Sequence, residues 1–405
     1  MALTIQTLTA QTFPVKEGRL VFHRYTDWSA YDGALYIYNF STKTLDYISM
    51  SWNIVHTANA HFSPDGSKIV FMGIPKDQFV SKTDPNNRSK WDIFLWTVGD
   101  TAQPTNLTAG NGVLDQDPKF FSDNKRVAFK QNGDVAIVDI TTKAVTKLTT
   151  GGTVSERSME YPTMDGKEIM FEENSIIYRI NIATKDIVPV YTVPNVQSYY
   201  PIVRDDSTFY FSRWFSPSGH GDEIYLGKIY DIDSAVPVAF DTEAADESDA
   251  CPVDSTLVFF SSTRSGTKGG YDLYLGDIKS GLYWSLTYYG VNSSIHELGA
   301  SYTKFSYPTK VGALIETPKI FFLSQNFPNP FNPSTTIRYS LPRSSHVMMK
   351  VYDVYGREIS TLINKVQETG EHSVDLNLTN VSSGVFFYQL AVGNQTLTKK
   401  CVLLK

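Results

Sequence analysis

Cysteines are scarce in this sequence. The 405 residues include only Cys251 and Cys401, which lie far apart and form no CxxC pattern. Neither a disulfide framework nor a cysteine-based zinc site is therefore indicated. Cysteine scarcity is compatible with either a reducing or an oxidising compartment.

Long apolar runs are also absent. No stretch of 18 apolar residues occurs, so we expect no transmembrane segment. The N-terminal residues MALTIQTLTAQTFPVKEG lack the basic stretch followed by an apolar stretch that marks a signal peptide. Either the protein is cytoplasmic, or the sequence starts after an export signal.

Positive charge is in deficit over most of the chain. Residues 322–405 contain 8 basic and 5 acidic residues, a net charge of +3. Of the 36 basic and 42 acidic residues in the whole chain, 28 and 37 remain for the rest, a net charge of −9. An acidic main body argues against nucleic acid and anionic membranes as partners.

Signature motifs of several enzyme classes are missing. The sequence has no GxSxG elbow, no P-loop, no dinucleotide GxGxxG and no HExxH. The glycine-rich stretch SGTKGG at 265–270 lacks the following helix that a phosphate site needs. Serine-hydrolase, nucleotide-binding and zinc-protease chemistry are therefore not indicated.

Aromatic residues, in contrast, are abundant. The chain has 24 Tyr and 24 Phe, and such side chains favour strands. One pattern recurs along the chain: a turn such as SPDG, an apolar strand, a variable loop and an aromatic-rich strand. Its five full copies begin with residues 61–73, 119–131, 161–173, 200–214 and 250–264.

The spacing of the copies predicts an all-β fold of propeller type. Each copy has about four strands in roughly 40 to 50 residues, which is the period of a propeller blade. Residues 18–49 form a further unit that lacks an inner strand, and residues 296–305 look like an inner strand without a blade. We expect these two ends to combine, which gives six blades; a seventh blade within residues 1–18 is the alternative.

The repeat resembles the TolB-like propellers over most of residues 16–308. The closest matches are SPDG at 63–66 and SSTRSGTKGGYDLYL at 261–275. The resemblance implies a fold rather than a function, because this family includes binding proteins, scaffolds and enzymes.

The C-terminal region predicts a separate β-sandwich. Alternating runs between 347 and 405 are punctuated by glycines, a spacing that alone fits any Ig-like accessory or sugar-binding module. The motifs QNFPNPFNPSTTIRYSLP, KVYDVYGREISTL, SSGVFFYQL and KKCVLLK resemble the type A C-terminal sorting domain of type IX secretion cargo. This implies a Bacteroidetes-like source, a signal peptide missing here, the type IX machinery as a partner, and a secreted or outer-membrane surface location.

We therefore predict four segments. They are an N-terminal segment at 1–17, the propeller at 18–310, a linker at 311–324 and the sorting domain at 325–405.

Candidate ligand-binding residues come from the loops between the second and third strands of the blades, because binding concentrates on loops over a rigid scaffold. Arg24, Arg213 and Arg264 occupy similar positions in three blades and could bind a carboxylate or sulfate. The alternative is that each arginine pairs with a local acid or packs on a ring. Aromatic residues and a histidine of the same face could hold sugar rings or merely pack between blades; these candidates are Trp28, Tyr31, Trp91, Tyr199, Trp214 and His220.

Carboxylates near the starts of the inner strands are candidates for a metal or for catalysis. Aligning the repeats places Ala58, Gln116, Glu160, Tyr199, Glu247 and Glu297 at similar positions. Clustered oxygens at one channel mouth could hold Ca²⁺, the one cofactor that we consider, or shift a carboxyl pKa. The alternative is a rim of solvated acids. The metal candidates are Asp115, Asp117, Glu160, Asp246 and Glu247, and a transition-metal site would use His56, His220 and His296.

Three functions remain open. The first is a secreted, monomeric, non-catalytic protein that binds a polysaccharide or glycan. The second is a polysaccharide lyase or glycoside hydrolase that uses Glu247, Glu297 or His296 as acid or base. The third is a protein–protein scaffold.

Overall fold

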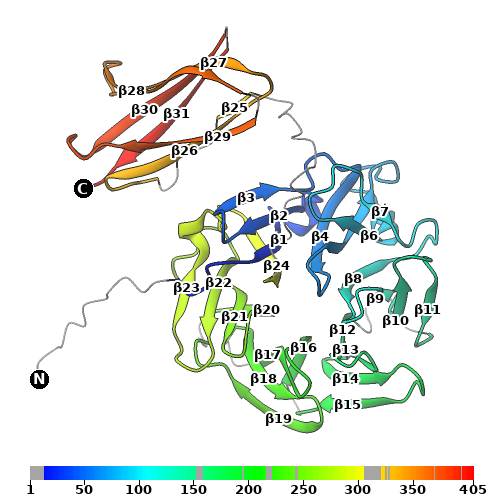
Figure 1. The fold of residues 1–405 in the computed structure, drawn as a ribbon. Coiled ribbons are helices and arrows are strands. Elements are labelled where there is room, and N and C mark those ends of the chain that lie inside the picture. Colours follow the sequence, from blue (N-terminus) through cyan, green and yellow to red (C-terminus); the bar gives the residue numbers. More distant parts are fainter. Residues whose placement is uncertain are drawn as a thin grey trace, which may run out of the picture. The chain divides into compact units, whose positions relative to one another are not determined.

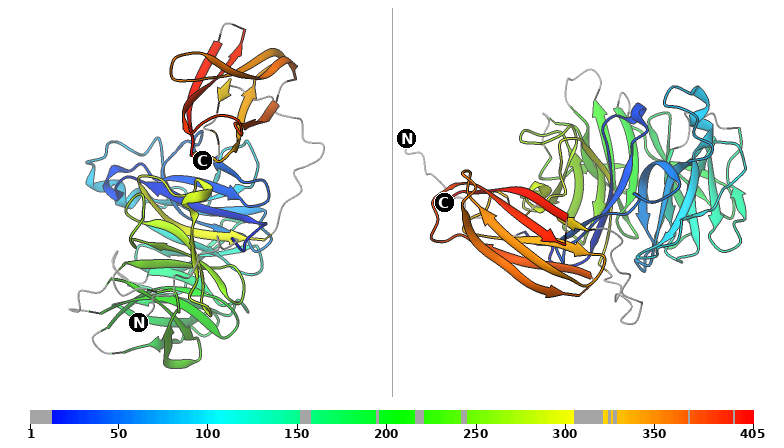
Figure 2. Two further views of the ribbon diagram at one scale, coloured as in Figure 1. Left: turned by 90° about the vertical axis from the view of Figure 1, so that its left-hand side faces the viewer. Right: turned by 90° about the horizontal axis from the view of Figure 1, so that it is seen from above.

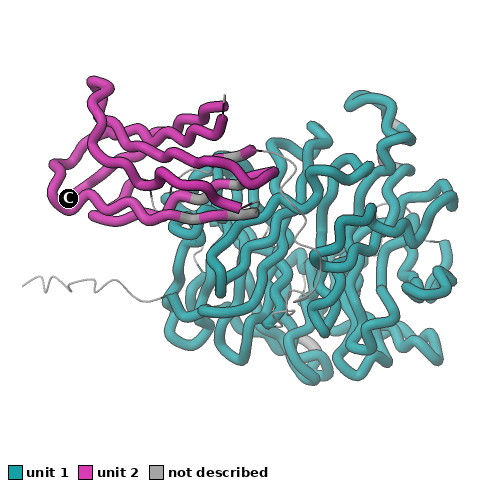
Figure 3. The backbone as a smooth tube through the Cα atoms, turned by 45° about the horizontal axis from the view of Figure 1, so that its top comes forward, with its two compact units in different colours: residues 1–307 teal, residues 308–405 magenta. Residues whose placement is uncertain are grey.

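The computed structural model describes residues 13–151, 158–193, 196–215, 221–241, 245–304, 321–323, 326, 329–368, 370–393 and 395–405. The chain divides into two compact units, residues 1–307 and 308–405 (Figure 3). The predicted boundary at residue 310 and most of the predicted linker lie outside the described residues, as do residues 1–12 of the predicted N-terminal segment.

The first unit contains six four-stranded antiparallel sheets arranged around a centre (Figure 1). The strands run roughly along the axis of the ring (Figure 2). We number the sheets as blades in chain order. Blade 1 is β24 (His296–Thr303), β1 (Arg19–Tyr25), β2 (Ala34–Asn39) and β3 (Thr44–Tyr47). Blade 2 is β4 (Ile54–Phe62), β5 (Lys68–Pro75), β6 (Asp92–Thr97) and β7 (Thr105–Asn106).

The other four blades are continuous in sequence. Blade 3 is β8 (Asp115–Phe120), β9 (Arg126–Gln131), β10 (Asp134–Asp139) and β11 (Val145–Lys147). Blade 4 is β12 (Ser158–Pro162), β13 (Glu168–Glu173), β14 (Ile176–Asn181) and β15 (Ile187–Tyr191). Blade 5 is β16 (Val196–Val203), β17 (Thr208–Phe215), β18 (Glu223–Lys228) and β19 (Asp231–Pro237). Blade 6 is β20 (Glu247–Pro252), β21 (Leu257–Ser262), β22 (Asp272–Asp277) and β23 (Tyr283–Ser285).

Helices are short in the described part of the chain. They are the 3₁₀ helices η1 (Trp28–Ala30), η2 (Pro85–Lys90) and η3 (Leu286–Tyr289). None of them has the length and apolar character needed to cross a bilayer.

The ring is closed by strands from the two ends of the first unit. β24 pairs with β1 from Arg19↔Thr303 to Tyr25↔His296, so the last strand is the inner strand of the first blade. The inner strands contact one another in a closed cycle of β24, β4, β8, β12, β16 and β20. The predicted six blades and their closure are therefore confirmed, and a seventh blade has no place in this cycle. The pairing with β24 also covers the edge of β1 that would otherwise have no neighbouring strand.

Each blade is buried on both faces. Six apolar clusters fill the six spaces between neighbouring blades, as in the cluster of Val21 and Leu35 from blade 1 with Phe62 and Phe71 from blade 2. A strand buried on both faces needs a continuous apolar run instead of alternation. This explains runs such as KIVFMGIP in β5.

Every inner strand carries a bulge at the same place. The register shifts by one residue in each of the six inner strands, and the first residue of each bulge has a positive φ. Gly, Asn and Asp tolerate this conformation best and occupy four of the six positions. The bulge residues are Asn59, Asp117, Met159, Tyr200, Asp249 and Gly299.

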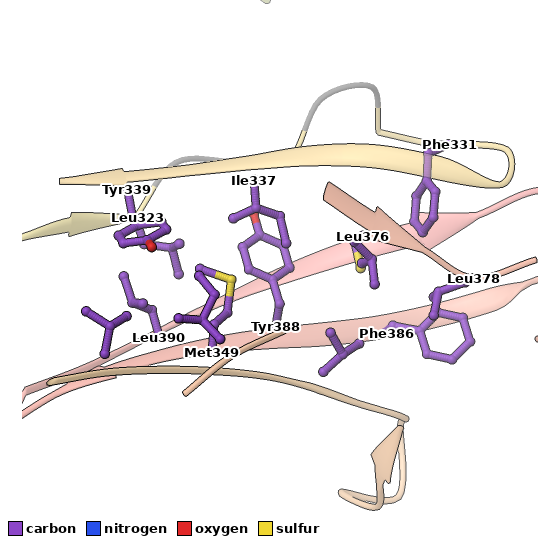
Figure 4. Packing of buried hydrophobic residues seen from close by; sticks show 14 of the residues in the cluster. Leu323, Phe331, Ile337, Tyr339, Met349, Leu376, Leu378, Phe386, Tyr388 and Leu390 are labelled. Atoms are coloured by element: carbon purple, nitrogen blue, oxygen red, sulfur yellow. The ribbon is translucent and has the colours of Figure 1, made fainter. Parts of the chain in front are cut away.

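The second unit is a sandwich of two sheets. One sheet has the order β25 (Phe322–Leu323), β26 (Ser334–Leu341) and β29 (Gly370–Asn377). The other has the order β28 (Glu358–Gln367), β27 (Ser345–Tyr352), β30 (Gly384–Val392) and β31 (Gln395–Leu403). Ile337, Met349, Tyr388 and Leu390 lie in the apolar core between the sheets (Figure 4).

The proline-rich segment before β26 is anchored to the end of the chain. Phe331 is buried and exchanges backbone hydrogen bonds with Val402 and Leu404 beside β31. Pro330 and Pro333 follow cis peptide bonds. The strand β26 begins at Ser334, directly after Pro333.

The Gly299 bulge provides a test of this inner-strand geometry. A Cβ at Gly299 would lie 2.6 Å from the ring of buried His23, whereas a Cβ at Gly110 would meet nothing within 4 Å; both residues have positive φ. We expect Gly110→Ala to cost about 1 kcal/mol of folding free energy through the backbone alone, and Gly299→Ala to cost about 1–3 kcal/mol more through overpacking. Denaturant unfolding measures both, and equal losses would contradict the bulge packing.

Candidate functional site

The three rim arginines are engaged within the propeller. Arg264 is buried, forms an ion pair with Glu247, and donates to Ser262 Oγ at 3.1 Å. Its guanidinium also lies 4.2 Å from the centre of the Tyr283 ring. Its donors and its flat face are therefore directed into the protein.

Arg24 and Arg213 follow the same pattern. Arg24 lies 3.0 Å from Glu297 Oε1, donates to the Gly290 carbonyl at 3.0 Å, and covers the Tyr36 ring at 4.4 Å. The Arg213 guanidinium lies 4.7 Å from the Tyr225 ring centre. Local pairing and ring packing, the alternative raised from sequence, describe the positions of all three arginines.

The buried ion pair between Arg264 and Glu247 predicts a large loss of stability when one partner is removed. Removing one partner leaves the other charge buried without compensation, so Arg264→Met should cost about 3–5 kcal/mol. The double variant Arg264→Met/Glu247→Gln should recover part of this loss, because it removes both charges. Thermal unfolding measures both variants, and a wild-type melting temperature for Arg264→Met would contradict a structural role.

The candidate carboxylates lie at different positions relative to the bulge residue of their inner strands. Relative to the bulge residue, Glu247 and Glu297 lie two positions before it, Tyr199 lies one before it and Glu160 lies one after it. The sequence alignment that gave them similar positions was therefore off by one to three residues between blades, because the turns and loops that it aligned do not fix the exact register of the inner strands. The position two before the bulge is 0 or 1% exposed in the five blades where it is described, at Thr57, Asp115, Ser198, Glu247 and Glu297.

The two glutamates considered for catalysis consequently face the protein interior. Burial raises the pKa of Glu297 to about 7, although hydrogen bonds from Ser293 and the charge of Arg24 favour its ionised form. Glu247 is fully buried beside Arg264. His296 lies between the Tyr25 and Tyr271 rings and accepts the Tyr271 backbone N–H at Nδ1.

The proposed metal ligands do not converge. Asp115 accepts from Gln131 and Asn111, Asp117 accepts from Asn59, and Asp246 accepts from the Asp222 backbone N–H. Glu160 is fully buried, and desolvation together with the charge of Asp117 raises its pKa well above the ordinary value. Within the described ranges, no three His, Cys, Asp or Glu side chains are placed to hold an ion. His56 is buried among the Trp28, Trp91 and Tyr31 rings, and His220 lies outside the described residues.

Asp115 gives the propeller a measurable pH dependence. Burial raises its pKa from 3.8 to about 6, so the folded state keeps a proton that the unfolded chain releases. Its contribution to stability is therefore present below about pH 4 and is lost as the pH rises through about 6. Relative to wild type, Asp115→Asn should gain on the order of 1–3 kcal/mol between pH 4 and pH 7.

Denaturant unfolding across this pH range measures the difference. Asp100→Asn, a change at an exposed aspartate of blade 2, is the control and should show no such trend. A constant difference between Asp115→Asn and wild type from pH 4 to 7 would contradict the assignment.

The candidate aromatic residues separate into packed and accessible rings. Trp91 is 2% exposed and stacks in parallel with Trp28, which is 42% exposed, at 5.7 Å between ring centres. Tyr31 packs against His56 and Phe79. Trp91 therefore supports Trp28 from inside, and Trp28 is the accessible ring of this pair.

Two of the predicted ligand-binding residues, Tyr199 and Trp214, line one pocket on the loop face. We use the name loop face for the end of the ring that carries the connections between the second and third strands of each blade. The loop-face pocket has a volume of about 480 Å³. Tyr199 donates its hydroxyl hydrogen to Asp222 there. The pocket is lined by Glu172, Gln197, Tyr199, Tyr200, Trp214 and Asp222.

Asp222 is the carboxylate of this pocket. Burial raises its pKa, against the opposing effect of the hydrogen bond from Tyr199, and Asp246 and Asp249 raise it further. The pocket thus combines partly buried aromatic rings with carboxylate and amide groups, and none of its described lining residues is a lysine or arginine.

A second cavity lies at the opposite end of the channel. We use the name turn face for the end that carries the SPDG-type turns, and turn-face well for the cavity of about 530 Å³ that opens between them. Bulge residues such as Asn59 and Tyr200 line it, as do His61 and Lys119. Sequence reasoning missed this cavity, because the inner strands are rich in polar residues, as in IVHTANAHF and DQDPKF, and His61 and Lys119 do not stand out in them.

Comparison with known proteins assigns the second unit. A family model described as a secretion system C-terminal sorting domain matches residues 325–404. Residues 325–404 are a type IX secretion sorting domain. The protein is therefore cargo of this system, secreted and attached at the cell surface. No curated protein matches the sequence.

Solved structures support the fold of the first unit. TolB from Acinetobacter baumannii matches with a TM-score of 0.52 and 17% identity, over 70% of this chain and 66% of TolB, just under two thirds of its length. A putative TolB from Agrobacterium tumefaciens matches with a TM-score of 0.47 and 13% identity, over 67% of this chain and 88% of the other. PorZ, a type IX secretion component of Porphyromonas gingivalis, matches with a TM-score of 0.41 and 12% identity, over 95% of this chain and 58% of PorZ. The propeller of this sorting-domain protein is TolB-like in fold.

Proposed function

We propose that the protein is a secreted, non-catalytic binding protein that holds a neutral glycan in the loop-face pocket. The observation that carries this proposal is the meeting of Tyr199, Tyr200 and Trp214 with Asp222 and Gln197 in one open pocket. Aromatic faces stack on the C–H faces of sugar rings, and carboxylate and amide groups bond sugar hydroxyls. The sorting domain supports the proposal, since it places the propeller where extracellular glycans occur.

The charge of the pocket favours a neutral ligand over a uronic acid polymer. The arginines considered for anion binding are occupied by Glu247, Glu297 and aromatic rings. The pocket itself contributes Asp222 and Glu172. An anionic sugar would therefore meet negative charge without a compensating cation.

The geometry gives less support to the alternative of a lyase or hydrolase. A general acid or base must reach the substrate within hydrogen-bond distance. Glu247 and Glu297 are fully buried beside arginines, and His296 is held between two tyrosine rings. A scaffold function has no specific contact in its favour.

Binding of the full chain to immobilised polysaccharides tests the proposal. The panel should contain neutral β-glucan, xylan and mannan together with anionic pectate and alginate. We expect at least one neutral glycan to bind, and Trp214→Ala to weaken it by about tenfold or more, as expected for a central aromatic contact. Trp28→Ala, at an exposed tryptophan of blade 1, is the matched control and should keep wild-type affinity.

Two results would overturn the proposal. One is the absence of binding to every neutral glycan. The other is stronger binding to pectate or alginate that survives Trp214→Ala.

A further inference from the structure

The turn-face well is built from a second ring of inner-strand residues. Because every inner strand has the same bulge, the residue two positions after the bulge lies at an equivalent place in each blade. All six of these residues line the well: His61, Lys119, Tyr161, Ile202, Cys251 and Ser301.

The walls nearer the opening contain both apolar and charged residues. The apolar ones include Pro64, Met164, Val203, Val253 and Tyr302, and the charged ones are Arg204, Asp205 and Asp254. Arg204 lies 3.7 Å from Asp205 and donates to the Ser255 carbonyl at 2.6 Å. A volume of about 530 Å³ falls within the range of about 300–1,000 Å³ that small-molecule pockets occupy. The well is separate from the loop-face pocket except for Tyr200, which lines both.

Three hydrogen-bond donors of this ring have no acceptor among the described residues. The first is the Lys119 ammonium, which makes no hydrogen bond or close ion pair with a described residue. The second is Ser301, whose Oγ accepts the Phe62 backbone N–H at 3.1 Å and whose hydroxyl hydrogen is donated to no described residue.

The third donor follows from the tautomer of His61. His61 Nδ1 accepts the Phe120 backbone N–H at 3.3 Å, so the ring hydrogen of the neutral imidazole is on Nε2. Nε2 lies 3.2 Å from the Tyr161 hydroxyl oxygen and donates to it. Burial keeps His61 neutral by lowering its pKa to about 3. The hydroxyl hydrogen of Tyr161 consequently remains available to a ligand.

Burial lowers the pKa of the Lys119 ammonium, and the charges of Asp117, Asp249 and Glu160 oppose this effect. Two of these three carboxylates have hydrogen-bond partners of their own. Asp117 accepts from Asn59 at 2.6 Å, and Asp249 accepts the Gly299 backbone N–H at 3.2 Å. Both are bulge residues, and each lies two positions before the residue of its own strand that belongs to the ring of Lys119. Burial also raises the pKa of Asp249 and so reduces its negative charge.

We propose that the turn-face well binds a small apolar carboxylate, with its carboxylate on Lys119, Tyr161 and Ser301 and its apolar body against the walls of the well. The two oxygens of a carboxylate offer about four acceptor sites, which is enough to accept a hydrogen bond from each of the three unused donors. A charge-assisted hydrogen bond to an ammonium is the strongest type available here. Apolar walls favour a hydrocarbon or aryl body over a sugar.

Titration calorimetry of the full chain with three matched probes tests this proposal. The probes are 3-phenylpropanoate, 3-phenylpropanol and 3-phenylpropylamine, which share a body and differ in the head group. We expect the carboxylate to bind at least about tenfold more tightly than the alcohol, and the amine to bind most weakly. Lys119→Met should reduce the affinity for the carboxylate to that for the alcohol.

Lys125→Met is the control, because Lys125 is an exposed lysine on the turn of the same blade and should not affect binding. Tyr161→Phe keeps the ring and removes one donor, so it should weaken the carboxylate about three- to tenfold even if Lys119→Met does not fold. Val253→Trp should exclude all three probes by narrowing the well.

The proposal is overturned if the alcohol or amine binds as tightly as the carboxylate, if none of the probes binds, or if Lys119→Met and Tyr161→Phe both keep wild-type affinity. These outcomes leave the glycan proposal unaffected, because its variants and ligands concern the other end of the channel.

Discussion

Apolar packing between neighbouring blades is the interaction on which the rest of this structure depends. A single four-stranded sheet buries too little surface to be stable alone, and here each sheet is covered on both faces by its neighbours. The ring closes only because β24 completes blade 1. The cost of placing polar groups between blades then decides where charges can lie.

This packing explains why the rim arginines serve the fold. Glu247 and Glu297 lie at inner-strand positions that the blade interfaces bury completely. A buried carboxylate is retained only when it is paired, and Arg264 and Arg24 supply the partners.

The repeated bulge decides which side chains form that wall. In a regular strand, every second side chain points to the same face. The extra residue of the bulge reverses this alternation within each inner strand. Buried residues precede the bulge by two positions, whereas the bulge residue and the residue two positions later face the channel. Two chemically different cavities result: an aromatic and acidic pocket on the loop face, and an apolar well with unused donors on the turn face.

The six blades, their closure and the sorting domain could be predicted from the sequence. Those features depend on local patterns, namely the SPDG-type turns, the apolar runs and the motifs around QNFPNPFNPSTTIRYSL. The sequence also pointed to Tyr199 and Trp214, which the fold brings into one pocket. Only the tertiary structure decided that Glu247 faces Arg264, that Trp91 is covered by Trp28, and that Lys119 lies in a well. These outcomes depend on contacts between residues far apart in sequence and, in the inner strands, on a one-residue bulge that reverses which side of the strand each later side chain occupies; local sequence patterns show neither.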